Sequence, residues 1–322
     1  MGFTATATRQ LSSLVAFSVW LSLMFRRKEI SKLLKDLNNL AIFFGASVNV
    51  VIIRTCGFIV FLVPIMAWIS KFVLFEEIEC KHLMGYYSLD SVGIPDGQNC
   101  KVLAFIASIF SFIFFVPPAY TSVFYVIVCL FFRKVLNIHS ITGSRKVTNC
   151  DYKMKYSNMK NYLLKYEYVL EFLKHFEETM SLPIFLIQAG DLVGMFSGFI
   201  WLNARMNNLI QNGVLRNTYL GIFFISFYSF VSFMSVSLAA SSVHEAGKKY
   251  KETEEKLLKN VLTSMQENDT SGQFLLLVAH ENPPFILSAW GFFYFTKGLI
   301  LVAVGSVLTY SLLIIQITSY KT

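Results

Sequence analysis

Residues 102–132 form a run of 31 consecutive residues without a charged side chain, bounded by Lys101 and Arg133. A soluble helix of that length needs a polar face toward water, whereas a transmembrane helix needs about 20 apolar residues. The run is also too long for one strand of a membrane barrel, which spans the bilayer in about 9–11 residues of alternating polarity. The segment therefore predicts a helix that crosses a lipid bilayer.

Other apolar segments have the same character, and the composition supports the assignment. Hydrophobic residues make up 55% of the 322-residue chain and charged residues 15%, whereas soluble domains carry about 25% charged residues. We predict an all-α integral membrane protein with one transmembrane domain over residues 1–322. Its six visible spans are expected at approximately 11–25, 46–70, 102–132, 182–204, 217–243 and 288–317.

Lysine and arginine assign the two sides of the membrane. Nineteen of the 28 lie in three segments, 26–35, 133–174 and 248–259, and these segments alternate with poorly charged ones. Because basic residues accumulate in cytoplasmic loops, the three segments are predicted to be cytoplasmic and the C-terminus to be outside. That topology excludes a G-protein-coupled receptor and an ordinary six-helix cation channel, whose C-termini are cytoplasmic.

Several other functional classes are also excluded. The net charge of +8 follows from the loop asymmetry, so it does not indicate nucleic-acid binding. The five histidines are isolated, and there is no glycine-rich phosphate loop, serine elbow or metal-ligand spacing. We therefore expect neither an enzyme nor a cofactor or metal site.

Two long cytoplasmic segments, 133–181 and 244–287, are expected to fold as helices. Residues 157–180 place Leu164, Tyr168, Phe172 and Phe176 one helical turn apart, which predicts an amphipathic helix that continues into the span at 182–204. Such extensions either form a bundle below the membrane or remain solvated continuations of the membrane helices.

The polar residues inside predicted spans include Gln188 and Asp191 in 182–204, and Lys297 in 288–317. An ionised carboxylate at that depth costs several kcal/mol unless it is paired or hydrated. One hypothesis is an ion pair between Asp191 and Lys297. The alternatives are a carboxylate that attracts cations near an inner pore, and a carboxylate exposed to water.

Small and aromatic residues mark further candidates. Gly190, Gly194 and Gly198 recur every four residues, a pattern that allows close helix packing in membranes. Aromatic residues in the outer halves of the spans are candidates for a ligand pocket, because small organic ligands bind in mostly apolar cavities. They are Phe115, Tyr120, Trp201, Tyr219 and Phe223.

The last span carries a recognisable pattern, TYSLLIIQI, in which Thr309 and Tyr310 are followed after five residues by Gln316. It resembles the C-terminal signature of the insect gustatory receptors, with Ile317 in place of the usual phenylalanine. Gly291 and Phe293 are similar to the family's glycine-aromatic pair, and RRKEISKLLKDLNNL to its first large cytoplasmic loop. The family has seven helices, so the resemblance implies a further helix before residue 11.

The resemblance implies a tastant-gated, non-selective cation channel in the plasma membrane of chemosensory neurons, formed by four identical or different gustatory receptor subunits around one pore. It places Gln316 in a ring near the outer end of the pore helix, beside Leu313 and Ile317, with Thr309 and Tyr310 one to two turns below. The alternative role of Gln316 is a hydrogen bond between helices. Alternative functions are an odorant receptor of the same superfamily and a secondary transporter, although no internal repeat is visible.

Overall fold

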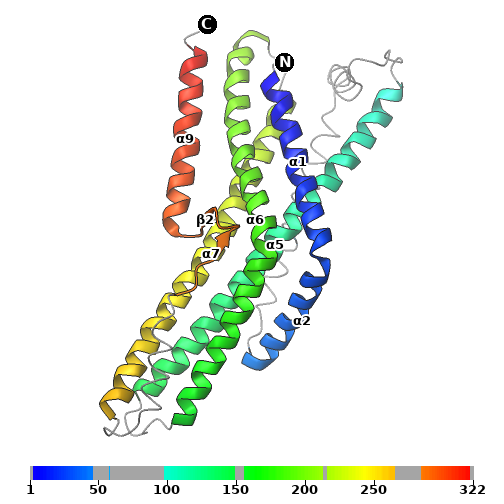
Figure 1. Ribbon diagram of the computed structural model, residues 1–322. Coiled ribbons are helices and arrows are strands. Elements are labelled where there is room, and N and C mark those ends of the chain that lie inside the picture. The colour runs from blue at the N-terminus through cyan, green and yellow to red at the C-terminus, as the bar shows by residue number, and fades with distance from the viewer. Residues whose placement is uncertain are drawn as a thin grey trace.

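The computed structural model describes residues 3–45, 58, 98–148, 156–212, 216–264 and 284–319. These residues form six helices and one two-stranded hairpin (Figure 1). The helices are α1 (Phe3–Phe25), α2 (Arg27–Phe44), α5 (Gln98–Thr148), α6 (Tyr156–Asn212), α7 (Arg216–Ser264) and α9 (Lys297–Ser319). The predicted span 46–70 lies outside the described residues except for Phe58, which is exposed.

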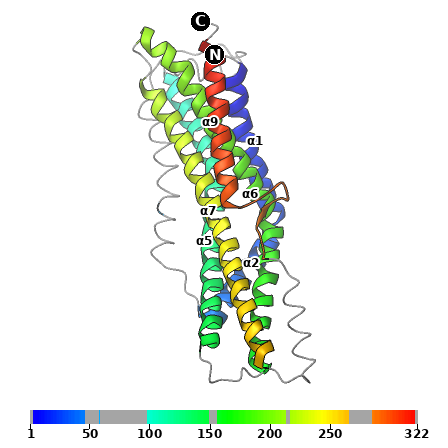
Figure 2. The same ribbon diagram turned by 90° about the vertical axis from the view of Figure 1, so that its left-hand side faces the viewer.

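The helices α5, α6 and α7 are long enough to cross a bilayer and continue beyond it. They contain 51, 57 and 49 residues, which corresponds to roughly 75 to 85 Å against a hydrocarbon core of about 30 Å. Within them, Val116–Ser144, Asn161–Phe196 and Ser226–Leu257 are apolar enough to span a membrane. Figures 1 and 2 show that these helices run on well below the base of α9.

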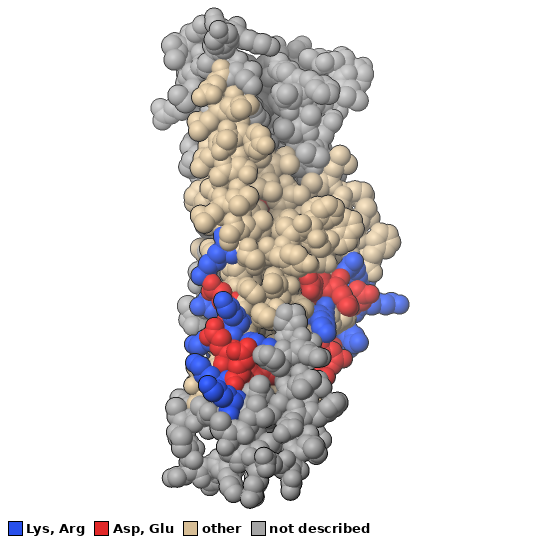
Figure 3. Space-filling view, turned by 60° about the vertical axis from the view of Figure 1, so that its left-hand side comes forward, with Lys and Arg blue, Asp and Glu red and all other residues tan. Residues whose placement is uncertain are grey.

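The termini and the charged residues agree with the predicted topology. The start of α1 and the end of α9 lie at the same end of the molecule (Figure 1). On the face in Figure 3, described Lys, Arg, Asp and Glu side chains lie in the lower part, and the described surface above them is uncharged. The basic segments therefore lie together on one side, as the alternation of charge predicted.

The lower part of the bundle has an aromatic core. The rings of Tyr166 and Tyr250 stack with centroids 3.8 Å apart, and those of His139 and Tyr162 are 4.1 Å apart. His139 Nε2 lies 3.1 Å from the carbonyl oxygen of Tyr162, so α5 and α6 are also joined by a polar contact. The predicted helix over 157–180 forms the first part of α6 and packs against α5 and α7 with Phe172 and Phe176 buried. The predicted apolar stripe was wrong at Leu164 and Tyr168, which are 50% and 41% exposed.

Two segments differ from the sequence-based expectation. The last helix begins at Lys297 rather than at 288, and residues before it form the hairpin of β1 (Ser288–Ala289) and β2 (Phe293–Tyr294). The stretch assigned to a cytoplasmic loop is the helix α2, with Leu33 and Leu40 buried. In both places the composition correctly indicated a basic or an apolar segment, but the predicted backbone conformation was wrong.

Candidate functional site

One face of α9 is left uncovered by the residues that the structure describes. Gly305, Thr309, Leu312 and Gln316 recur at intervals of three or four residues, so they lie on one helical face, and all four are exposed. The opposite stripe, Ile300, Val307 and Ser311, is buried. The helix therefore packs by one side and presents a mixed polar and apolar stripe on the other.

The predicted pore residues do not all share this stripe. Thr309 and Gln316 lie on it, and the Thr309 hydroxyl donates a hydrogen bond to the carbonyl oxygen of Gly305 at 2.8 Å. Leu313 is 48% exposed and lies at its border. Tyr310 is 59% exposed but lies on a different flank of α9, with its ring centroid 6.3 Å from that of Phe196 on α6. The side chain of Ile317 is outside the described part of the chain.

Sequence reasoning missed Leu312, which is 59% exposed and lies one turn from Gln316. The signal was available, because the spacing from Thr309 to Gln316 is two helical turns and residue 312 falls between them on the same face. Leu312 was missed because only the residues of the motif were considered, and not the other residues on the same helical face.

The buried side of α9 packs on α6 and α7. Val307 joins Met195 of α6 and Phe233 of α7 in a small apolar cluster. The hydroxyl of Ser311 is buried and makes no hydrogen bond to the described residues. This contact is small, and α9 is attached to the bundle less extensively than α7 is to α5 and α6.

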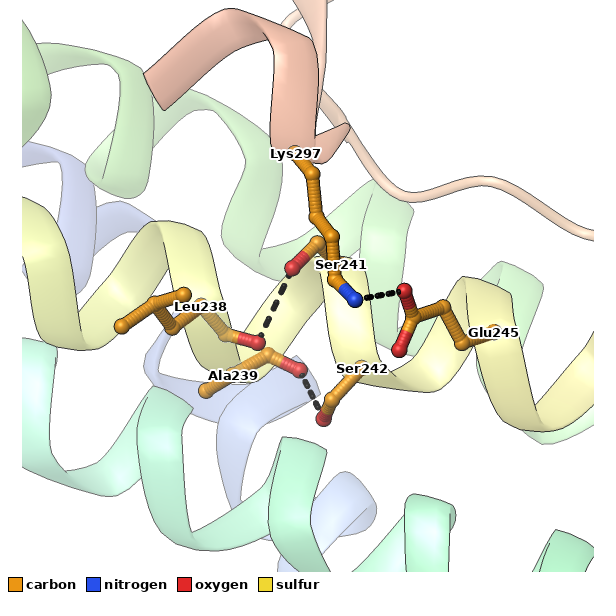
Figure 4. Close-up of polar contacts among 6 residues, drawn as sticks. All are labelled: Leu238, Ala239, Ser241, Ser242, Glu245 and Lys297. Atoms are coloured by element: carbon orange, nitrogen blue, oxygen red, sulfur yellow. Dashed lines mark hydrogen bonds and ion pairs between the residues drawn. The ribbon is translucent and has the colours of Figure 1, made fainter. Parts of the chain in front are cut away.

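The base of α9 is held by an ion pair with α7. Lys297 Nζ lies 2.5 Å from Glu245 Oε1 (Figure 4). The predicted pair between Lys297 and Asp191 was therefore wrong. The reason is the position of Lys297, which is the first residue of α9 rather than a residue inside a span, so its side chain reaches the charged part of α7.

Asp191 instead faces the interior of the bundle formed by α5, α6 and α7. It is 6% exposed and accepts a hydrogen bond from Ser232, and the hydroxyl of Ser232 lies 3.5 Å from that of Ser122. One turn away, Ser237 donates a hydrogen bond of 3.1 Å to Oε1 of the fully buried Gln188. Exposure of the Asp191 carboxylate to water, one of the predicted alternatives, does not occur.

The Asp191 cluster leads to a prediction about stability. Asparagine at position 191 keeps an acceptor for Ser232 and removes the charge, so Asp191→Asn should leave the melting temperature of the detergent-solubilised protein close to that of the unchanged chain. Asp191→Leu removes the acceptor from a buried hydroxyl and should destabilise the fold by about 1–3 kcal/mol. Equal destabilisation by the two variants would contradict this account, because it would mean that the charge itself is needed.

The Lys297–Glu245 pair leads to a second prediction. Both side chains are more than half exposed, 68% and 51%, so the pair is expected to contribute only about 0–1 kcal/mol. Lys297→Glu should therefore lower the free energy of unfolding of the detergent-solubilised protein by at most about 1 kcal/mol. The exchange Lys297→Glu with Glu245→Lys should restore the original value; an exchanged protein that stays as impaired as Lys297→Glu would exclude this contact.

The proposed ligand-pocket residues are only partly described. Tyr120, on α5, is 44% exposed. The side chains of Phe115, Trp201, Tyr219 and Phe223 lie outside the described part of the chain, although their backbones belong to α5, α6 and α7. The structure therefore shows which helices carry these four residues and describes the side chain of Tyr120 alone among the five candidates.

The chain has relatives among chemosensory receptors. A family model described as 7tm Chemosensory receptor matches residues 8–320. The fold is similar to the solved structure of the insect olfactory receptor OR5 from Machilis hrabei, with a TM-score of 0.70 at 12% identity over 97% of this chain and 82% of that one. The same receptor in complex with eugenol gives 0.73 at 11% identity over 98% and 83%. No curated protein matched the chain.

These comparisons confirm the predicted fold class and the predicted superfamily. At 11–12% identity the similarity to OR5 concerns the fold alone. The matching family consists of receptors, so the prediction that the chain is not an enzyme is also confirmed. Because the family model spans nearly the whole chain, the protein is a multi-pass membrane protein that belongs to the 7tm chemosensory receptor family.

Proposed function

We propose that this receptor is a gustatory receptor subunit that acts as a tastant-gated, non-selective cation channel. Four subunits, identical or from other gustatory receptors, would place the uncovered faces of their α9 helices around one water-filled path in the plasma membrane of a chemosensory neuron. The observation that carries the proposal is the exposed stripe of Gly305, Thr309, Leu312 and Gln316 on a helix that is buried only on its opposite side.

The chemistry of this stripe suits a pore better than a lipid contact. A primary amide facing hydrocarbon loses its hydrogen bonds to water, which costs free energy, whereas an amide in a pore keeps them. Four copies of Leu312 and Leu313 would narrow the path with apolar side chains, which can close by excluding water. Gln316 lies one turn away on the same face as Leu312, so a small rotation of α9 that moves Leu313 out of the path would leave the amide facing it and open the path.

The ligand is proposed to be a small-molecule tastant bound among the outer aromatic residues of α5, α6 and α7. Tyr120 and the neighbouring candidates Phe115, Trp201, Tyr219 and Phe223 would supply the apolar walls. The complex of OR5 with eugenol supports a small organic molecule as the class of ligand for this fold.

The second candidate is an odorant receptor of the same superfamily, which the similarity to OR5 favours. The spacing of Thr309, Tyr310 and Gln316 favours the gustatory branch. Responses to non-volatile sugars and bitter alkaloids, compared with volatile odorants on the same cells, separate the two.

Recording of single channels tests the proposal against a secondary transporter. With identical solutions on both sides and a held voltage, an effective tastant should evoke discrete steps of cation current. A transporter under the same conditions moves few ions for each conformational cycle and should give no resolvable steps. Uptake of the tastant without such steps would overturn the channel proposal.

A further inference from the structure

The hairpin before α9 presents three aromatic side chains to the outside. Trp290, Phe292 and Tyr294 are 52%, 70% and 58% exposed. The opposite side of the same segment is inside the protein, where Leu287, Ala289 and Phe295 are buried. The hairpin is therefore two-sided, with one face in the core and an aromatic face that no described residue covers completely.

The turn of the hairpin fixes this orientation. Trp290 and Gly291 have φ angles of 50° and 72°, and the Phe292 N–H donates to the carbonyl oxygen of Ala289 at 3.0 Å. A bulky residue rarely adopts a positive φ, so the tryptophan at this position is unusual. The two exposed rings also pack in part against Phe185 of α6, whose ring centroid lies 4.8 Å from that of Phe292 and 5.7 Å from that of Trp290.

Hydrogen bonds and charges place the hairpin at a defined height along the bundle. The Ser288 N–H donates to Glu177 Oε1 at 2.9 Å, and the Ser288 hydroxyl donates to the same oxygen. Arg26, at the junction of α1 and α2, donates to the carbonyl oxygens of Glu178 and Thr179, the two residues that follow Glu177 on α6. The Lys297–Glu245 pair follows directly at the end of the hairpin.

Above this height, charged residues nearly disappear from the described helices. From Thr179 to Phe196 on α6, Asp191 is the only charged residue, and it is buried. Residues 217–244 of α7 and 298–319 of α9 contain none. Figure 3 shows the same boundary on the surface, with charged side chains below and an uncharged surface above. The aromatic hairpin thus lies where the charged part of the protein meets the part that fits a bilayer.

We propose that the face formed by Trp290, Phe292 and Tyr294 inserts into the lipid headgroup region of the leaflet next to the basic segments. Tryptophan and tyrosine combine an apolar body with an N–H or O–H group, and they gather at membrane–water boundaries for that reason. The inserted hairpin sets the depth of the first residue of α9 in the membrane. This inference goes beyond the proposed channel function and requires only that the protein spans a bilayer.

Depth-dependent quenching of Trp290 tests the proposal. The chain contains four tryptophans, so Trp20→Phe, Trp68→Phe and Trp201→Phe together leave Trp290 as the only one. The full chain is reconstituted into phosphatidylcholine vesicles that carry a spin label either near the headgroup or near the end of the acyl chain. We expect a larger loss of Trp290 emission with the label near the headgroup. A matched protein that keeps only Trp20, which is 44% exposed inside the apolar part of α1, should respond more strongly to the deep label.

Two results would overturn the proposal. Quenching by aqueous acrylamide without quenching by either lipid label would place the hairpin in water. Protection from both kinds of quencher would mean that a second copy of the chain covers it. If the triple variant does not fold, the difference in emission between the unchanged chain and Trp290→Phe reports the same quenching of Trp290.

Discussion

Leucine at position 198 is expected to abolish the folded receptor. A Cβ atom on Gly198 would lie 1.6 Å from Ser226 Oγ and 2.5 Å from Ser226 Cβ, so even alanine forces α6 away from α7. The larger side chain of Gly198→Leu cannot be placed without separating the two helices, and we expect a loss of about 3 kcal/mol, the upper part of the range for overpacked sites. Surface biotinylation should show little or no receptor at the cell surface.

Gly305 supplies the matched control for this variant. No atom lies within 4 Å of a Cβ placed on Gly305, which is on the uncovered face of α9. Alanine is favoured over glycine inside a helix by about 1 kcal/mol, so Gly305→Ala should reach the surface as well as the unchanged chain. Normal surface expression of Gly198→Leu would contradict the close packing of α6 on α7.

The substitution Gln316→Arg is expected to eliminate cation current while the receptor still reaches the cell surface. In a fourfold pore this change places four guanidinium groups around the path. Even one positive charge about 8 Å from a passing cation raises its energy by roughly 2 kcal/mol at an effective dielectric constant of 20. The current should therefore fall by more than tenfold, since about 1.4 kcal/mol corresponds to a factor of ten.

Tyr310 provides a control for the position on the helix. Its ring is near Phe196 and away from the stripe, so Tyr310→Phe should conduct nearly as the unchanged receptor does. Tastant-evoked currents are measured by whole-cell voltage clamp and normalised to surface receptor. A Gln316→Arg receptor that conducts normally would exclude this face of α9 from the pore.

The helical membrane architecture could be predicted from the sequence, but the direction in which each side chain points could not. Long uncharged runs predict the membrane spans, and alternating basic segments predict which side of the membrane each loop is on. Both patterns depend only on whether a segment is surrounded by lipid or by water. The four-residue glycine spacing also predicts close packing. In the structure the three glycines pack against two different helices: Gly194 and Gly198 face α7, whereas Gly190 faces Val15 of α1.

Polar partners could not be predicted, because they depend on which way each residue points. Asp191 and Lys297 have similar apparent depth in the sequence, but Asp191 points to Ser232 and Lys297 pairs with Glu245. The beginning of α9 was misplaced for a related reason. The residues SAWGFFYF are apolar enough for a span, and only the turn at Trp290 and Gly291 reveals a hairpin.

Water access to α9 is the most direct test of the account. Thr309→Cys and Gln316→Cys are compared with Phe230→Cys on α7, whose side chain is 40% exposed on the outside of the bundle. Each is treated with a charged methanethiosulfonate reagent on intact cells, with the unchanged chain as the background for its five cysteines. A pore on the free face of α9 predicts modification of Gln316→Cys and Thr309→Cys and none of Phe230→Cys. Equal protection of all three would mean that this face of α9 contacts lipid, and it would contradict the proposed pore.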